Sequence, residues 1–74
     1  MKNIILYGAP FCANCQVVKR VLASKDIPFA YVDIADDEQA ADLLASQGFL
    51  GLPVMKENSN TYVGLKAVEI ARAY

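Results

Sequence analysis

Four short segments rich in apolar residues and bounded by turn-forming residues mark the strands expected in this chain of 74 residues. The run Ile4–Tyr7 is apolar throughout and is followed by Gly-Ala-Pro, as expected of a buried strand that ends in a turn. The segment Phe29–Ile34 alternates and is rich in aromatic and β-branched residues, which predicts a second strand. The runs Pro53–Lys56 and Asn60–Val63 flank Glu-Asn-Ser and predict a β-hairpin.

Two longer segments have the 3.6-residue periodicity of amphipathic helices. The pattern over Cys12–Ser24 predicts a helix that Pro28 prevents from continuing. The pattern over Leu65–Tyr74 predicts a helix that closes the fold. The positions expected to face the core are Val17, Val18, Val21 and Leu22 in the earlier helix and Ala67, Ile70, Ala71 and Tyr74 in the later one.

A further helix is expected between the second strand and the hairpin. Asp36 or Asp37 can cap its first turn, and Gln39 is placed for a capping-box contact to Asp36. Gly48 is a suitable residue to end this helix. Its expected apolar stripe consists of Ala40, Leu43 and Leu44.

The resulting order of elements, βαβαββα, predicts an α/β fold. Two strands joined through a helix should be parallel, with a right-handed crossover, and the hairpin adds an antiparallel pair. A four-stranded mixed sheet flanked by three helices follows from this order. We expect a single domain over residues 1–74, because a chain of this length forms no more than one.

Composition and charge narrow the classes of function. Apolar residues make up 55% of the chain, which is enough for a compact core without a staple or a partner, so we expect a monomer. Seven basic and eight acidic residues give a net charge of -1, so no basic face for nucleic acid or an anionic membrane is expected. The first apolar run is too short for a secretory signal or a membrane span, and we expect a cytoplasmic protein.

The two cysteines, Cys12 and Cys15, lie where the loop after the first strand meets a helix. Two cysteines at this spacing in a chain without a secretory signal indicate redox or metal chemistry. Unpaired backbone N–H groups and the helix dipole favour a thiolate at the first turn, and the thiolate is the nucleophile in disulfide exchange. We expect Cys12, at the helix start, to be exposed and to attack a target disulfide. Cys15, one turn further in, then attacks the Cys12 sulfur, releases the reduced target and leaves a Cys12–Cys15 disulfide.

Two other interpretations of the cysteine pair stay open at this point. The two thiols can be buried structural residues that happen to lie at a helix start. The pair can also bind a metal, but a zinc site needs four ligands, and the chain offers two thiolates and no His. A metal would therefore require a dimer, carboxylate ligands or an external thiol.

The segment Tyr7–Cys15 reads Tyr-Gly-Ala-Pro-Phe-Cys-Ala-Asn-Cys, which is similar to the active-site approach of glutaredoxins and of NrdH-redoxins. Residues Gln47–Val54 and Tyr62–Leu65 are similar as well, so the resemblance covers essentially the whole chain. It implies the thioredoxin fold and a thiol–disulfide oxidoreductase. It also implies no bound cofactor, the redox-active disulfide being the protein's own.

The resemblance also implies which residues surround the cysteines. The proline that matches Pro53 is cis in that family and faces the cysteine pair. This arrangement would let the Leu52 backbone pair with an extended substrate. The local sequence fits a trans proline equally well. Gly64 matches a glycine where the backbone approaches a bound partner, although a plain strand-to-helix turn also explains it. Tyr7, which ends the first strand near the cysteines, is expected to be a core aromatic residue with its hydroxyl at the rim. The predicted site comprises Cys12 and Cys15 as catalytic residues, Phe11, Leu52, Pro53 and Gly64 as substrate-binding residues, and Tyr7, Ala13 and Asn14 as supporting residues.

Departures from the glutathione-dependent pattern decide the expected reductant. Glutaredoxins that use glutathione commonly carry Lys or Arg where this chain has Ala9, and a Gly-Gly pair followed by a polar or acidic residue where it has Val-Gly-Leu-Lys over residues 63–66. Glutathione should bind poorly where these charged contacts are missing. Thioredoxins are longer, and their buried acid near the resolving cysteine has no counterpart within Ile4–Tyr7.

The single glycine and the Gly-Phe-x-x-Leu-Pro-Val run are more similar to NrdH-redoxins. This similarity implies electrons from NADPH through thioredoxin reductase, passed to a ribonucleotide reductase. Two alternatives stay open. One is a glutathione-dependent glutaredoxin in which Lys66 meets a glutathione carboxylate, and the other is a metal- or iron–sulfur-carrying module in which a dimer shares Cys12.

Overall fold

The computed structural model describes residues 3–49 and 51–74 of the chain. The elements in chain order are β1 (Ile4–Gly8), α1 (Ala13–Ser24), β2 (Ala30–Asp33), α2 (Glu38–Ser46), β3 (Val54–Glu57), β4 (Asn60–Val63) and α3 (Leu65–Ala73). This is the predicted βαβαββα order. Leu50, which belongs to a motif that carries the family resemblance, lies outside the described residues, as do Met1 and Lys2. Within the described ranges, no helix is long and apolar enough to cross a lipid bilayer.

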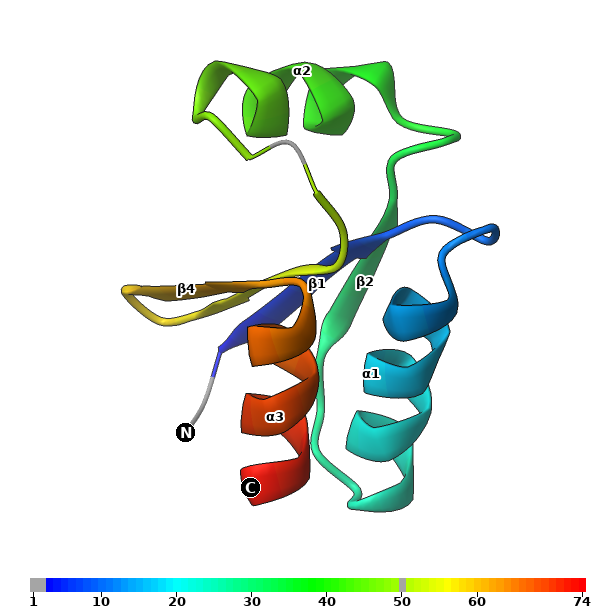
Figure 1. The fold of residues 1–74 in the computed structure, drawn as a ribbon, viewed down its shortest axis with the longest axis vertical. Helices are drawn as coiled ribbons and strands as arrows, with labels where there is room; N and C mark the ends of the chain where they lie inside the picture. The colour runs from blue at the N-terminus through cyan, green and yellow to red at the C-terminus, as the bar shows by residue number, and fades with distance from the viewer. Residues whose placement is uncertain (1–2, 50) are drawn as a thin grey trace.

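The four strands form one mixed sheet in the order β2-β1-β3-β4. Strand β1 pairs in parallel with β2, where Tyr7 lies opposite Val32, and antiparallel with β3, where Tyr7 lies opposite Val54. The hairpin pairs β3 with β4. Helices α1 and α3 cover one face of the sheet and α2 covers the other (Figure 1). The predicted architecture, a mixed sheet flanked by three helices, is confirmed.

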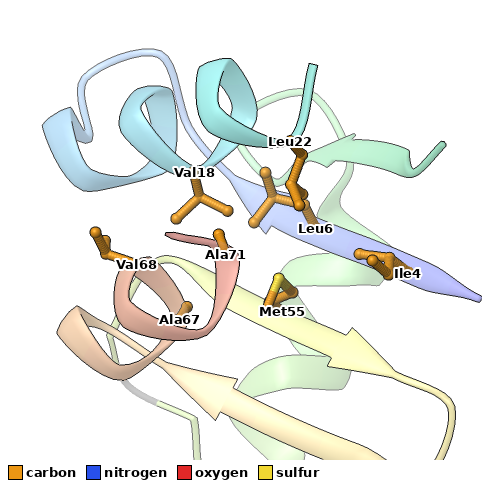
Figure 2. Close-up of a cluster of buried hydrophobic side chains, with 8 residues drawn as sticks. All are labelled: Ile4, Leu6, Val18, Leu22, Met55, Ala67, Val68 and Ala71. Carbon is orange, nitrogen blue, oxygen red and sulfur yellow. The ribbon is translucent and has the colours of Figure 1, made fainter. Parts of the chain in front are cut away.

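The larger part of the core lies between the sheet and the pair α1–α3 (Figure 2). Leu6 from β1, Leu22 from α1 and Met55 from β3 are fully buried there. Burying side chains of this size stabilises a fold by about 1.5–3 kcal/mol each. A smaller cluster under α2 consists of Tyr7, Ala40, Leu44 and Val54. Because both clusters share β1 and β3, the two central strands carry the core of both layers.

Two of the predicted helix faces differ from the observed ones. In α2, Ala40 and Leu44 are buried but Leu43 is 44% exposed, because a helix that packs on the sheet with one side contacts it through a narrow i, i+4 stripe. In α3, Val68 is buried with Ala67 and Ala71, although the pattern did not single it out. This helix packs against both α1 and the sheet, so it buries a wider face.

The first turn of α2 resolves the choice between two adjacent aspartates. Asp37 is the N-cap, and its Oδ1 accepts a hydrogen bond from the Ala40 N–H at 3.0 Å. The capping box expected between Asp36 and Gln39 is therefore wrong. With Asp37 as the cap, the position that would close such a box is Ala40, which has no side-chain group to do so.

Candidate active site

The turn between β1 and α1 holds the cysteine pair through its backbone. The Cys12 N–H donates to the Ala9 carbonyl at 3.1 Å, and the Gln16 N–H donates to the Cys12 carbonyl at 3.2 Å. The Gln16 side chain adds a further bond from Nε2 to the Ala9 carbonyl, also at 3.1 Å. Ala9 is fully buried. Because Ala9 is anchored in the protein and bonded to both Cys12 and Gln16, the start of α1 is held in one position relative to β1.

Cys12 is the N-cap residue of α1, so the helix itself begins one residue later than predicted. Its backbone is extended, and its Sγ accepts a hydrogen bond from the Cys15 N–H at 3.2 Å. This N–H is one of the donors in a first helical turn that have no partner within the helix. The helix therefore directs a backbone donor and the positive end of its dipole at the sulfur. Since Cys12 is only half-buried, a target disulfide can reach it.

Cys15 lies on the inner face of α1 and is completely buried. Burial, followed by its interactions with Cys12, raises the pKa of the Cys15 thiol to about 12, although a hydrogen bond to the Ala9 backbone acts in the opposite direction. At neutral pH, Cys15 is therefore a neutral thiol. Cys12, which was predicted to be exposed, is half-buried, and Cys15 lies deeper, as predicted.

Gly8, the last residue of β1, leaves the space that the Cys15 side chain occupies. A Cβ added at Gly8 would lie 2.9 Å from Cys15 Cβ and 3.1 Å from Cys15 Sγ. The hydroxyl oxygen of Tyr31 would lie 3.0 Å from the same point. The Cys15 thiol and the Tyr31 hydroxyl therefore converge above Gly8, on the face of the sheet that α1 covers.

The loop before β3 reaches the same end of the sheet as the cysteines. Because Val54 pairs with Tyr7, Pro53 lies where β1 ends and the cysteine loop begins. The Leu52–Pro53 peptide bond is cis, as the family resemblance implied. The Pro53 carbonyl accepts a hydrogen bond from the Gly64 N–H at 2.8 Å, which ties this loop to the end of β4. Pairing of the Leu52 backbone with a substrate stays a prediction.

Gly64 connects β4 to α3 and has φ 63 and ψ -133. Residues with a side chain rarely adopt this conformation. A Cβ at Gly64 would contact no atom of the described residues within 4 Å, so the backbone conformation rather than crowding requires glycine here. The strand-to-helix turn is thus sufficient to explain the residue, and its contact with a partner stays a prediction.

Three of the predicted site residues border Cys12 at the surface. Phe11 is 81% exposed, more than the other exposed large apolar side chains of the described residues, and is available to a docking partner. Ala13 is exposed and Asn14 half-buried in the first turn of α1. The roles of these residues in binding and support stay predictions.

Tyr7 is a core residue, as predicted, but it does not lie on the side of the cysteines. It is 8% exposed and packs with Ala40 and Leu44 under α2. Successive side chains of a strand point to opposite faces of the sheet, so Tyr7 points away from the face on which Gly8 contacts Cys15. The supporting role of Tyr7 stays a prediction, and the tyrosine hydroxyl on the side of Cys15 is that of Tyr31.

An open pocket of about 430 Å³ adjoins the cysteine loop, and sequence reasoning missed it. Its lining residues are Pro10, Gln16, Lys19, Tyr31 and Asp33. Lys19 Nζ lies 4.2 Å from the centre of the Tyr31 ring. The available signal was periodicity: Gln16 and Lys19 share the polar face of α1, and Tyr31 and Asp33 share one face of β2. The sequence predicts both elements, but not that these two faces meet.

Metal binding receives no support from the arrangement of side chains. Across residues 3–49 and 51–74, no three His, Cys, Asp or Glu side chains gather as ligands for one metal ion. A metal at the cysteine pair would have to complete its coordination from outside this part of the chain.

The sequence of this chain is similar to those of known proteins. Residues 6–67 match the family model described as Glutathione S-transferase, N-terminal domain. A glutaredoxin-like 8.6 kDa protein of the rubredoxin operon of Clostridium pasteurianum is 34% identical over 68 residues, which cover 90% of this chain and 91% of the relative. The glutaredoxin-like protein NrdH of Salmonella typhimurium is 31% identical over 72 residues, which cover 97% of this chain and 89% of the relative. The chain belongs to the glutaredoxin-like redoxins of the thioredoxin superfamily.

The redoxin also matches a solved structure of NrdH-redoxin from Escherichia coli. The TM-score is 0.85 at 26% identity, and the match covers 97% of this chain and 95% of the other. The thioredoxin fold implied by the sequence motifs is therefore confirmed. The redoxin is a thiol–disulfide oxidoreductase, and its cysteine pair lies where the fold places one accessible and one buried sulfur.

Proposed function

We propose that the redoxin is a cytoplasmic, monomeric dithiol electron carrier that reduces disulfides of other proteins through Cys12 and Cys15. It is recharged from NADPH by thioredoxin reductase and serves a ribonucleotide reductase. The observation that carries the proposal is the asymmetry of the pair. One sulfur caps a helix and is reachable, and the other is a buried neutral thiol beneath it.

The cycle follows from this asymmetry in two exchanges. The Cys12 thiolate attacks one sulfur of the target disulfide, forms a mixed disulfide and releases the first target sulfur as a thiolate, which takes up a proton. Cys15 then gives up its proton and attacks Cys12 Sγ. The bond between Cys12 and the target breaks, the second target sulfur leaves and is protonated, and the redoxin holds a Cys12–Cys15 disulfide. Two electrons have moved from the cysteine pair to the target.

Several features favour thioredoxin reductase over glutathione as the source of electrons. Ala9 is buried in the loop before the cysteines, so that position supplies no cation for a glutathione carboxylate. The Lys66 ammonium lies 3.8 Å from the Glu69 carboxylate, which partly satisfies its charge. Relatives of this redoxin are named NrdH, and the solved Escherichia coli structure is described as having a thioredoxin-like activity profile.

Oxidation of NADPH in a reconstituted system tests the proposal. The redoxin and a protein disulfide substrate are supplied with thioredoxin reductase in one reaction and with glutathione and glutathione reductase in another. We expect turnover in the first reaction and little in the second. Turnover only with glutathione would overturn the assignment of the reductant and favour the glutaredoxin alternative.

Variants of the two cysteines test their roles in the same assay. Cys12→Ser should abolish turnover, since the attacking sulfur is gone. Cys15→Ser should stop the cycle at the mixed disulfide, which is detectable as a covalent adduct by mass spectrometry. A Cys15→Ser variant that turns over protein disulfides at the unmodified rate contradicts the two-cysteine mechanism. Addition of oxidised ribonucleotide reductase as the terminal substrate tests the proposed target.

A further inference from the structure

The Tyr31 hydroxyl is the polar side-chain group that the fold brings from β2 toward the resolving sulfur. Both groups pack against Gly8: the hydroxyl oxygen lies 3.0 Å, and Cys15 Sγ 3.1 Å, from the position of a Cβ at that residue. Two atoms this close to one point cannot be further from each other than the two distances together. The hydroxyl and the sulfur are therefore near neighbours on the same face of the sheet.

The bonds around Tyr31 indicate how its hydrogen is used. The Gln16 Nε2 donates a hydrogen bond to the Ala9 carbonyl. Because a carbonyl oxygen only accepts, the amide atom that faces Ala9 must be the nitrogen. The Gln16 side chain lines the same pocket as Tyr31 and lowers the pKa of that phenol, which is the effect of a group that donates toward its oxygen. With Gln16 acting on the oxygen as a donor, the Tyr31 hydrogen is available for another acceptor.

Tyr31 also remains protonated, as a donor must. Burial, followed by the charges of Asp33, Cys15 and Cys12, raises the pKa of Tyr31, and this outweighs the opposite effect of Gln16. The Lys19 ammonium above the ring face holds the ring in place through a cation–π contact. The phenol is thus positioned by contacts to two residues of α1.

Cys15 needs such a donor because it must become an anion in a buried site. The core of the described residues contains no buried charged or polar side chain that could support a thiolate. The groups that face the sulfur are the Ala9 backbone from the loop after β1, Cys12 at the N-cap of α1, and Tyr31 from β2. Lys19 of α1 and Asp33 of β2 line the adjoining pocket together with Tyr31.

We propose that the Tyr31 hydroxyl donates a hydrogen bond to Cys15 Sγ while this sulfur is an anion, and thereby accelerates resolution of the mixed disulfide. The inference rests on the proposed two-cysteine function. The bonds that form and break are those of the second exchange: Cys15 loses its proton, the Cys12–Cys15 bond forms, and the target sulfur leaves and accepts a proton. Tyr31 transfers no atom, and its bond strengthens as charge develops on Cys15.

The two exchanges can be timed separately with a symmetrical aromatic disulfide that releases a coloured thiolate. Reduced redoxin releases one equivalent when Cys12 attacks and a second when Cys15 resolves the adduct. In Tyr31→Phe, we expect the rate of the first phase to be unchanged. The second phase should slow about tenfold, because one charge-assisted hydrogen bond to Cys15 is lost. The rise of the second-phase rate with pH should also move upward by about one unit.

Tyr62→Phe is the matched control, because Tyr62 lies on β4 at the opposite edge of the sheet from β2. It should leave both phases unchanged. An unchanged second phase in Tyr31→Phe overturns the inference. Equal slowing of both phases, with no shift in pH dependence, shows a purely structural role and overturns it as well. If the unmodified redoxin releases only one equivalent, the proposed two-cysteine function fails instead.

Discussion

Replacing Gly8 with alanine tests how closely α1 approaches the sheet. The added Cβ would meet Cys15 Cβ at 2.9 Å, the Tyr31 oxygen at 3.0 Å and Cys15 Sγ at 3.1 Å. The Tyr31 oxygen and the Cys15 sulfur can rotate away, but Cys15 Cβ is attached to the helix backbone. Relief of that contact therefore requires the first turn of α1 to move away from β1.

The expected size of the effect follows from two opposing contributions. Overpacking of a well-packed core costs about 1–3 kcal/mol. Alanine also restricts the unfolded chain more than glycine does, which raises the unfolding free energy by about 0.4–1 kcal/mol. The Gly8→Ala variant should thus lose about 1–2 kcal/mol of unfolding free energy. In a domain of this size each kcal/mol lowers Tm by about 4–8 °C, so the melting temperature should fall by roughly 5–15 °C.

Thermal unfolding of the reduced protein, followed by circular dichroism, measures this loss against a matched glycine. Among the residues that the structure describes, a Cβ at Gly51 would meet only the Val63 Cγ1, at an ordinary contact distance of 3.9 Å. Gly51→Ala should therefore leave Tm unchanged or raise it slightly. If Gly8→Ala and Gly51→Ala melt at the same temperature, the contact between Gly8 and Cys15 is not tight, and the reasoning about α1 is refuted.

Three further changes test the stability of the fold. Asp37→Ala should cost about 1 kcal/mol in urea unfolding through loss of the α2 cap, whereas Asp36→Ala should cost clearly less; equal costs contradict the assignment of the cap. The reduced protein should become less stable as the pH rises above 9. The pKa of the Cys15 thiol is about 12 in the folded chain and 9.0 ordinarily, so the unfolded chain releases this proton at a lower pH than the folded chain does. The unfolding free energy should fall by at most about 1.4 kcal/mol per pH unit. Urea unfolding at several pH values measures this fall, which should be smaller in Cys15→Ala. Leu22→Ala should cost about 2–5 kcal/mol in the same assay and Leu43→Ala far less, since Leu22 is fully buried and Leu43 is 44% exposed.

Hydrophobic periodicity was sufficient to predict the elements of this redoxin because each strand and helix buries one face. It was not sufficient to choose between neighbouring residues. Either Asp36 or Asp37 can cap a helix by its chemistry, and the choice depends on which residue has the extended backbone. In the same way, Leu43 and Leu44 are equally apolar, and only the rotation of α2 on the sheet decides that Leu44 is buried.

The site shows the same division between local and long-range information. The cysteine pair is predictable because a helix start acts on Cys12 through its own next turn. The position of Tyr31 near Cys15 is not predictable from local sequence. It depends on how closely α1 packs over β1, which the absence of a side chain at Gly8 allows. A larger residue at that position would separate α1 from β1 and carry Cys15 away from Tyr31. One glycine thus sets both the packing of the helix and the surroundings of the resolving sulfur, and its effect on the second exchange should follow its effect on stability.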